Sequence, residues 1–358
     1  MASILLFVAG AALLVFSAEQ LIRRLVGIAS GFHISLFLVS VVFTGIEFDD
    51  IVLGVALNFE DLGGVALGVV IGTALSMTGV VLALAAILTP TRVRIPRDYV
   101  LIFACAPLVM VVCALTAPLT ALDGVALLGL FALFLAYVAV RESRDDTPVF
   151  RDAELYEAYS LARGSRDAPP VRRGADARAI TAERTCAGAP PGDGLLAQVR
   201  ERSGWTGLGL AVLALAGLVA GSAITGIGTK GILQTYGLQG TVFGATIVTV
   251  VLTVEDVFLT VEPARKGAPE IGVGNVIGSV VFSVTGKLGI VLLAGSVVID
   301  RSVLTWHLPA LLVVNGFAAY VISTGRLRRR HGFALLALYV VYWVVSFIGF
   351  GMVPADTS

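Results

Sequence analysis

Residues 271–298 read IGVGNVIGSVVFSVTGKLGIVLLAGSVV, and this stretch decides the fold. It carries a single charge, Lys287, and is longer than the roughly 20 mostly apolar residues that a membrane-spanning helix needs. The whole chain has the same character: of its 358 residues 57% are hydrophobic and 14% are charged, and the mean hydropathy is +0.93. Soluble proteins average about 25% charged residues. The composition excludes a soluble domain, a nucleic-acid-binding protein and a disordered chain, and it predicts an all-α polytopic membrane protein.

Ten apolar segments of sufficient length divide into two groups of five around one polar insert. The predicted spans are residues 3–22, 34–59, 64–88, 99–118, 122–140, 205–229, 238–262, 271–298, 303–322 and 332–352. The insert is so polar that Arg141 to Arg202 holds 22 of the 50 charged residues. We therefore expect a first five-helix repeat over 1–140, a largely flexible linker over 141–204 with a short helix near 152–163, and a second five-helix repeat over 205–358.

The basic residues of the short loops predict the orientation in the membrane. Eleven fall in alternate loops on one side: Arg23, Arg24, Arg92, Arg94, Arg97, Arg265, Lys266, Arg326, Arg328, Arg329 and Arg330. The opposite loops hold only Lys230 and Arg301. Because cytoplasmic loops are enriched in Lys and Arg, both termini are predicted outside and the linker inside the cytoplasm. The expected location is the plasma membrane of a prokaryote, with the first apolar segment retained as a helix.

An internal repeat appears when the chain is shifted by 206 residues. Asp50 then falls on Asp256, and GVVIGT (Gly68–Thr73) falls on GNVIGS (Gly274–Ser279). Since each half has an odd number of spans, the second half enters the membrane from the opposite face. Such inverted repeats are typical of secondary transporters, whose substrate site lies near the bilayer midplane where the repeats meet.

Two predicted spans contain acidic doublets, and these are the candidate chemistry. The acids are Glu47, Asp49 and Asp50 in 34–59, and Glu255 and Asp256 in 238–262. An ionised carboxylate in hydrocarbon costs about 2.5–3.5 kcal/mol even on a lenient scale, so these groups are expected to face the protein interior, water or a cation. Glu47 and Asp50 are three residues apart and share one helix face, and Thr253 and Asp256 repeat that spacing.

Hydroxyl and amide groups in 64–88 and 271–298 extend this polar set. They are Thr73, Ser76, Asn275, Ser279 and Ser283. Oxygen ligands suit hard cations such as Ca²⁺ and Na⁺, whereas zinc or copper favours the nitrogen and sulfur ligands that are missing from this set. The glycine pairs Gly68/Gly72 and Gly274/Gly278 predict close helix packing that brings the acidic and hydroxyl-bearing spans together.

Lys287 is the one basic residue inside a predicted span. A buried ammonium group could pair with the acids and take the place of one bound cation. The alternative is snorkelling to the outer interface. That interface is about 16 Å away along the helix, which favours an internal partner.

The sequence is similar to the sodium/calcium exchanger family of the cation/calcium antiporter superfamily. The best local match is RKGAPEIGVGNVIGS (Arg265–Ser279), and the resemblance extends over nearly the whole chain. It implies that Asp50 and Asp256 stand where the family has its key glutamates. The family motif GTSLPE reads GIEFDD at 45–50 and VLTVED at 251–256, so both helix-breaking prolines are absent.

We predict a secondary antiporter that exchanges Ca²⁺, or a similar divalent cation, for Na⁺ or H⁺ by alternating access, with no cofactor. The predicted transport site is Glu47, Asp50, Thr253, Asp256, Ser279 and Ser283, with Asp50, Asp256 and Glu47 as the metal ligands. Secondary candidates are Asp49, Glu255, Thr73, Asn275 and Lys287.

Other functions remain open at the level of sequence. One is a proton-coupled exchanger of another divalent cation, and another is a cation channel. An enzyme is disfavoured, because neither a Gly-x-Gly-Asp-like intramembrane protease signature nor a Ser–His or HExxH motif occurs. The expected partners are the transported cations and the lipid bilayer, without nucleic acid. A monomer is compatible with the sequence, and the oligomeric state is left open.

Overall fold

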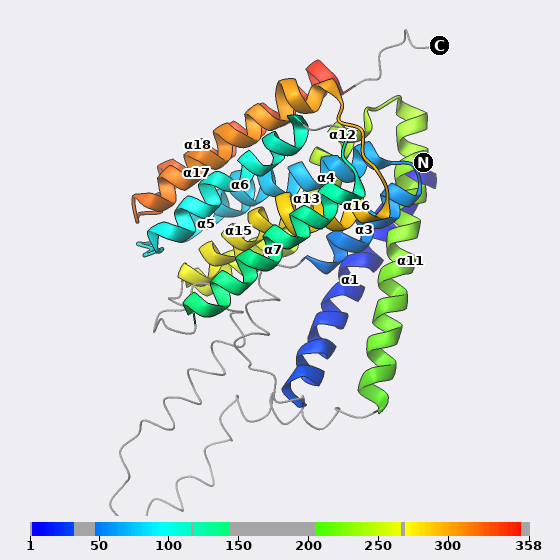
Figure 1. The fold of residues 1–358 in the computed structure, drawn as a ribbon, viewed down its shortest axis with the longest axis horizontal. Helices are drawn as coiled ribbons and strands as arrows, with labels where there is room; N and C mark the ends of the chain where they lie inside the picture. Colours follow the sequence, from blue (N-terminus) through cyan, green and yellow to red (C-terminus); the bar gives the residue numbers. More distant parts are fainter. Residues whose placement is uncertain (1, 32–46, 116–117, 143–204, 266–268, 352–358) are drawn as a thin grey trace, which may run out of the picture.

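The computed structural model describes residues 2–31, 47–115, 118–142, 205–265 and 269–351, and the regular elements of these residues are helices (Figure 1). The first half contains α1 (Ala2–Gly31), α3 (Phe48–Phe59), α4 (Gly63–Ser76), α5 (Leu82–Leu88), α6 (Arg97–Leu115) and α7 (Ala121–Glu142). The second half contains α11 (Trp205–Tyr236), α12 (Gly240–Phe243), α13 (Thr249–Leu252), α14 (Val254–Arg265), α15 (Pro269–Phe282), α16 (Leu288–Ala294), α17 (Leu308–Ser323) and α18 (Arg329–Phe350).

Four short π-helical turns connect or begin these helices. They are η1 (Met77–Val81) between α4 and α5, η2 (Gly244–Val248) between α12 and α13, η3 (Ser283–Lys287) between α15 and α16, and η4 (Val303–His307) before α17. The predicted linker and its short helix near 152–163 lie outside the described residues, as does the first part of the predicted span 34–59.

Seven helical segments of the described residues are long and apolar enough to cross a membrane: Gly63–Leu88, Arg97–Leu115, Ala121–Arg141, Val212–Tyr236, Pro269–Ala294, Val303–Ser323 and Arg329–Phe350. An eighth is formed if the bent pair Gly240–Leu252 and Asp256–Glu262 is one span. The apolar part of α1, Ala2–Ser17, is shorter. The predicted membrane-embedded helical fold is thus confirmed, while the number of ten spans stays a prediction.

The two most buried segments form the centre of the bundle. In Gly63–Leu88 and Pro269–Ala294 the apolar windows are 83% and 89% buried, against 22% in α7 and in α18. The latter helices lie along opposite edges of the bundle (Figure 1) and expose large apolar side chains such as Leu133 and Ile348. An outward apolar surface is what lipid contact requires.

The helix boundaries recur at the spacing found in the sequence. Adding 206 to both bounds of α3, α4, η1 and α5 gives the bounds of α14, α15, η3 and α16. The contacts recur as well: α7 packs on α16, and its counterpart α18 packs on α5. The two halves therefore share one sequence of helices and turns, and each half packs its last helix against the other half.

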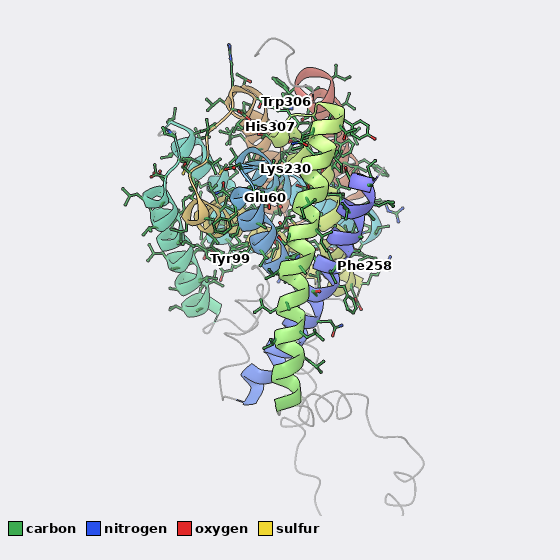
Figure 2. The ribbon with its side chains drawn as sticks, turned by 90° about the vertical axis from the view of Figure 1, so that its right-hand side faces the viewer. Glu60, Tyr99, Lys230, Phe258, Trp306 and His307 are labelled. Carbon is green, nitrogen blue, oxygen red and sulfur yellow. The ribbon has the colours of Figure 1, made fainter. Side chains whose placement is uncertain are left out.

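The first helices of the two halves run antiparallel along each other. Phe7 of α1 lies beside Gly228 of α11, and Leu14 lies beside Gly221, so residue numbers rise in one helix as they fall in the other. Figures 1 and 2 both show this pair side by side, extending away from the central helices. Glycine permits the contact, since a Cβ at Gly221 would lie 2.6 Å from the backbone nitrogen of Leu14.

Loops predicted on the same side of the membrane meet at one end of the bundle. The backbones of Arg92 and Arg326 form an isolated antiparallel bridge, and the Arg94 amide donates to a Glu270 carboxylate oxygen at 3.3 Å. Loops predicted on the other side of the membrane also contact each other, since the backbones of Leu119 and Val297 form a second isolated antiparallel bridge. These contacts agree with the alternation of basic and non-basic loops along the chain.

The predicted close packing at Gly68 and Gly72 is present, and it joins the two halves. A Cβ at Gly72 would lie 2.6 Å from the Cα of Ala245 in η2, and one at Gly68 would overlap the Thr241 carbonyl in α12. Helices in lipid associate through such backbone contacts, because no hydrophobic effect drives them together there. The central helix α4 is therefore held against the other half by contacts that tolerate no added atom.

We expect Gly72→Ala to destabilise the protein by about 1–3 kcal/mol, since overpacking of a close helix contact forces backbone shifts. Thermal unfolding in detergent measures the effect. Gly129→Ala in α7 is the matched control, because a Cβ there meets nothing within 4 Å. Equal melting temperatures for the two variants would contradict the packing argument.

Candidate cation-binding site

The acidic segments lie where two helices begin. Glu47 has an extended backbone (φ −83°, ψ 92°) directly before α3. At Thr253 the chain bends, and the helical segments on either side meet at 49°. The span predicted over 238–262 is therefore bent at Thr253, and α3 begins directly after Glu47, although neither motif contains proline. The part of the predicted span 34–59 before Glu47 lies outside the described residues. Asp50 and Asp256 fall in the first turns of α3 and α14, where exposed backbone N–H groups favour negative charge.

Lys287 joins the second half of the chain to the acids of the first half. Its ammonium nitrogen lies 2.5 Å from Glu47 Oε2 and forms a second ion pair with Asp50 Oδ2. The Lys287 side chain has no exposed surface, and the side chains of Asp50 and Glu47 are 4% and 13% exposed. The expected internal partner of Lys287 is confirmed, and snorkelling is excluded.

Thr73 of α4 completes this cluster. Its hydroxyl accepts a hydrogen bond from Lys287 Nζ at 3.1 Å and lies 2.9 Å from Asp50 Oδ2, to which it donates. Glu47, Asp50, Thr73 and Lys287 are called the Lys287 cluster below. It contains two carboxylates, one ammonium and one hydroxyl, so its formal charge is negative when all groups are ionised.

Contacts far from the cluster fix the position of α3. At its other end Asn58 donates to the carbonyl oxygens of Val291 and Gly295, at 2.8 and 2.9 Å. Gly54 allows α3 to approach α16 closely, because a Cβ at this position would lie 2.8 Å from Val291 Cγ2. Since α16 continues directly from η3, this anchoring aligns the start of α3 with Lys287.

A second polar contact joins the halves beside the cluster. The Ser76 and Thr253 hydroxyls are hydrogen-bonded at 2.8 Å, and the Ser76 hydroxyl also lies 3.2 Å from the Thr73 carbonyl oxygen. Thr253 in turn donates to the carbonyl oxygen of Thr249 at 2.7 Å. Both residues are buried, so the bend at Thr253 is tied to α4 next to Thr73.

The other predicted site residues differ in their burial and in their hydrogen-bond partners. Ser279 and Ser283 are buried in α15 and η3, and within the described part of the chain the Ser283 hydroxyl has no hydrogen-bond partner. Asn275 instead donates to the Thr260 hydroxyl at 3.4 Å. Asp256 is half-buried.

Two secondary candidates remain. Asp49 is half-buried in the first turn of α3. The Glu255 side chain lies outside the described residues.

Among the described residues, no group of three or more His, Cys, Asp or Glu side chains is arranged to hold a metal ion. The structure brings Glu47 and Asp50 together around Lys287, and the joint ligation of a metal by Glu47, Asp50 and Asp256 stays a prediction. Sequence reasoning did not single out Thr260, whose hydroxyl accepts from Asn275. The partner of Thr253 in Thr249 is the backbone carbonyl oxygen four residues earlier, which every helical position offers.

Solved structures of a sodium–calcium exchanger designated NCX_Mj have the same fold. The crystal soaked with 100 mM Na⁺ and 10 mM Sr²⁺ matches with a TM-score of 0.54 at 19% identity, covering 95% of this chain and 96% of that one. The crystal soaked with 2.5 mM Na⁺ and 0.1 mM Ca²⁺ matches with a TM-score of 0.53, also at 19% identity, over 95% and 97% of the two chains. At this identity the likeness establishes the fold.

Sequence relatives match over shorter segments. Sodium/calcium exchanger MaX1 of Methanosarcina acetivorans is 31% identical over 115 residues, which is 32% of this chain and 33% of the relative. Inner membrane protein YrbG of Escherichia coli is 27% identical over 109 residues, or 30% and 34% of the two. The matched segments thus span about a third of these curated relatives.

The family profile covers far more of the chain. The profile described as sodium/calcium exchanger protein matches residues 2–140 and 206–348, which together include both halves and omit the polar linker. This match agrees with the apolar helices and with the fold shared with NCX_Mj. The chain therefore belongs to the sodium/calcium exchanger protein family and is an integral membrane protein.

Proposed function

We propose that this chain is a secondary antiporter that exchanges Ca²⁺, or a similar divalent cation, for Na⁺ or H⁺ across the membrane. The observation that carries the proposal is the burial of two carboxylates, Glu47 and Asp50, between helices of the two halves. Carboxylates are rare inside membrane proteins and mark ion pathways there. Carboxylate and hydroxyl oxygens are also the ligands that hard cations prefer.

The depth of the cluster supports a site near the middle of the membrane. Thr73 lies ten residues after the first residue of the segment Gly63–Leu88, which corresponds to about 15 Å along a helix. This is about half the 30 Å hydrocarbon thickness of a bilayer. A central site accessible alternately from each side is the arrangement on which secondary transporters depend.

The proposed architecture is ten spans in two inverted five-helix repeats. It is supported by the helix boundaries that recur after 206 residues, by the exchanged contacts of α7 and α18, and by the antiparallel pair α1 and α11. Both halves contribute polar groups beside the cluster, because Ser76 belongs to the first and Thr253 to the second. Sliding of the α1–α11 pair along the central helices is the proposed switch of access, as the family resemblance suggests.

Exchange of another divalent cation for protons remains the second candidate, and the charge of Lys287 favours a monovalent counter-ion in either candidate. Lys287 already supplies a positive charge to Glu47 and Asp50, so a divalent cation meets a smaller net negative charge than two free carboxylates would present. A smaller charge favours monovalent counter-ions over divalent ones. Asp256 and the hydroxyls of the second half would then supply the remaining ligands for a divalent cargo.

The proposed orientation, with termini outside and the linker in the cytoplasm of a prokaryotic cell, predicts sided labelling. In a variant without native cysteines, Arg301→Cys is expected to react with a membrane-impermeant maleimide in intact cells. Arg92→Cys is expected to react only after permeabilisation. Both positions are exposed, so accessibility on the protein is matched. The reverse pattern would overturn the orientation.

Substitution of the buried acid tests the transport site. We expect Asp50→Asn to lower Ca²⁺ uptake into liposomes, driven by a Na⁺ or pH gradient, at least tenfold, because about 1.4 kcal/mol of lost cation binding suffices for that change. Asp256→Asn is expected to act in the same direction.

The matched control is Asp61→Asn. Asp61 is exposed and has a positive φ of 60°, which asparagine tolerates well. Uptake by this variant should equal that of the unmodified protein. Unchanged uptake in both Asp50→Asn and Asp256→Asn would show that ions cross elsewhere.

A further inference from the structure

We infer that the Lys287 ammonium group is a tethered cation, which fills the position of one bound ion between Glu47 and Asp50 whenever no external cation is there. This inference rests on the proposed function, since it names how the proposed transport site is balanced when empty. It assigns Lys287 a role in setting how many cations the protein must bind, beyond holding two helices together.

The ammonium group occupies a complete set of oxygen ligands. A lysine ammonium has three N–H donors, and three oxygen acceptors surround that of Lys287: Glu47 Oε2 at 2.5 Å, Asp50 Oδ2, and Thr73 Oγ1 at 3.1 Å. These are two carboxylates and a hydroxyl, the groups that would ligate Na⁺ or Ca²⁺. An external cation using the same three oxygens must therefore displace the ammonium.

The fold itself does not require a cation at this position. The residue 206 positions before Lys287 is Val81, at the last position of the corresponding π-helical turn η1. Val81 is as fully buried as Lys287. The same turn is thus compatible with an apolar side chain, and apolar replacement of buried ion pairs often leaves stability unchanged or raises it. The presence of a lysine at this position is explained by Glu47 and Asp50, with which it forms ion pairs.

If the Lys287 ammonium group is removed, another positive charge must take its place beside Glu47 and Asp50. Without the ammonium, Glu47 and Asp50 are two buried like charges, and the effective penalty for burying each is several kcal/mol. One further oxygen belongs to the cluster itself, because Glu47 Oε1 is buried without a hydrogen-bond partner among the described residues. A free monovalent cation in the place of the ammonium group would find the ligands that Lys287 leaves and this additional oxygen.

The test is the dependence of thermal stability on Na⁺. The purified full-length protein is unfolded at pH 8 in NaCl or in choline chloride of equal ionic strength. We expect Na⁺ to raise the melting temperature of the unmodified protein less than that of Lys287→Met, because the ammonium group already fills the position. Lys287→Met should melt at a lower temperature in choline and gain at least about 3 °C, saturably, in Na⁺, because a ligand bound only by the folded state stabilises it.

Two further variants separate a binding site from a general loss of stability. Lys287→Met combined with Glu47→Gln and Asp50→Asn removes the two buried carboxylates as well, and its melting temperature should no longer depend on Na⁺. Lys230→Met is the control for loss of a lysine. Lys230 is exposed on α11, where Figure 2 shows it beside Glu60, 3.6 Å away, and this variant should behave as the unmodified protein does.

If Lys287→Met does not fold, Lys287→Gln serves instead, because it keeps a hydrogen-bond donor without the charge and should show the same Na⁺ dependence. Melting temperatures of the single Lys287 variants that do not respond to Na⁺ would overturn the inference. That result, together with intact cation exchange by the unmodified protein, would leave the proposed function standing. If instead the melting temperature of Lys287→Met responds clearly to Na⁺ while the unmodified protein exchanges no cations, the inference stands and the proposed function is contradicted.

Discussion

A charge inside a membrane protein must be neutralised by another charge or by a transported ion, and the centre of this structure follows from that constraint. Glu47 and Asp50 are placed at the start of α3, and Lys287 reaches them from the other half of the chain. Asn58 holds α3 along α16, and the glycines of α4 bring α12 and η2 into backbone contact. Each of these features serves to keep opposite charges together away from water.

The backbone of the two halves is far more alike than their side chains. Positions separated by 206 residues pair Glu47 with Thr253, Thr73 with Ser279, Ser76 with Phe282 and Val81 with Lys287. Repeated helices and turns therefore carry an unequal set of polar groups, with the buried ion pairs on the acids of the first half. An exchanger fold with an altered set of buried polar groups accounts for both the family match and the departures from the family motif.

Hydropathy predicts the seven long apolar helices of the described residues, because apolar runs of this length are helical in a membrane protein. The burial of Asp50 and the internal partner of Lys287 followed from the cost of charge in hydrocarbon. The bend at Thr253 is harder to predict, since its motif lacks proline and the bend is accompanied by tertiary contacts such as that of Ser76 with Thr253. For the same reason the sequence does not identify Thr260, to which Asn275 donates, as its partner. Side-chain direction within a span requires the packing of neighbouring helices.

The central claim is that cations cross this protein only in exchange, and flux of the unmodified protein in liposomes tests it most directly. Radioactive Ca²⁺ is supplied outside, and Na⁺, K⁺ or H⁺ gradients are imposed one at a time with the membrane potential clamped. The account predicts Ca²⁺ entry only when an outward gradient of Na⁺ or H⁺ is present, with that ion leaving as Ca²⁺ enters. Ca²⁺ entry without any counter-ion gradient, or no entry under any of them, would contradict it.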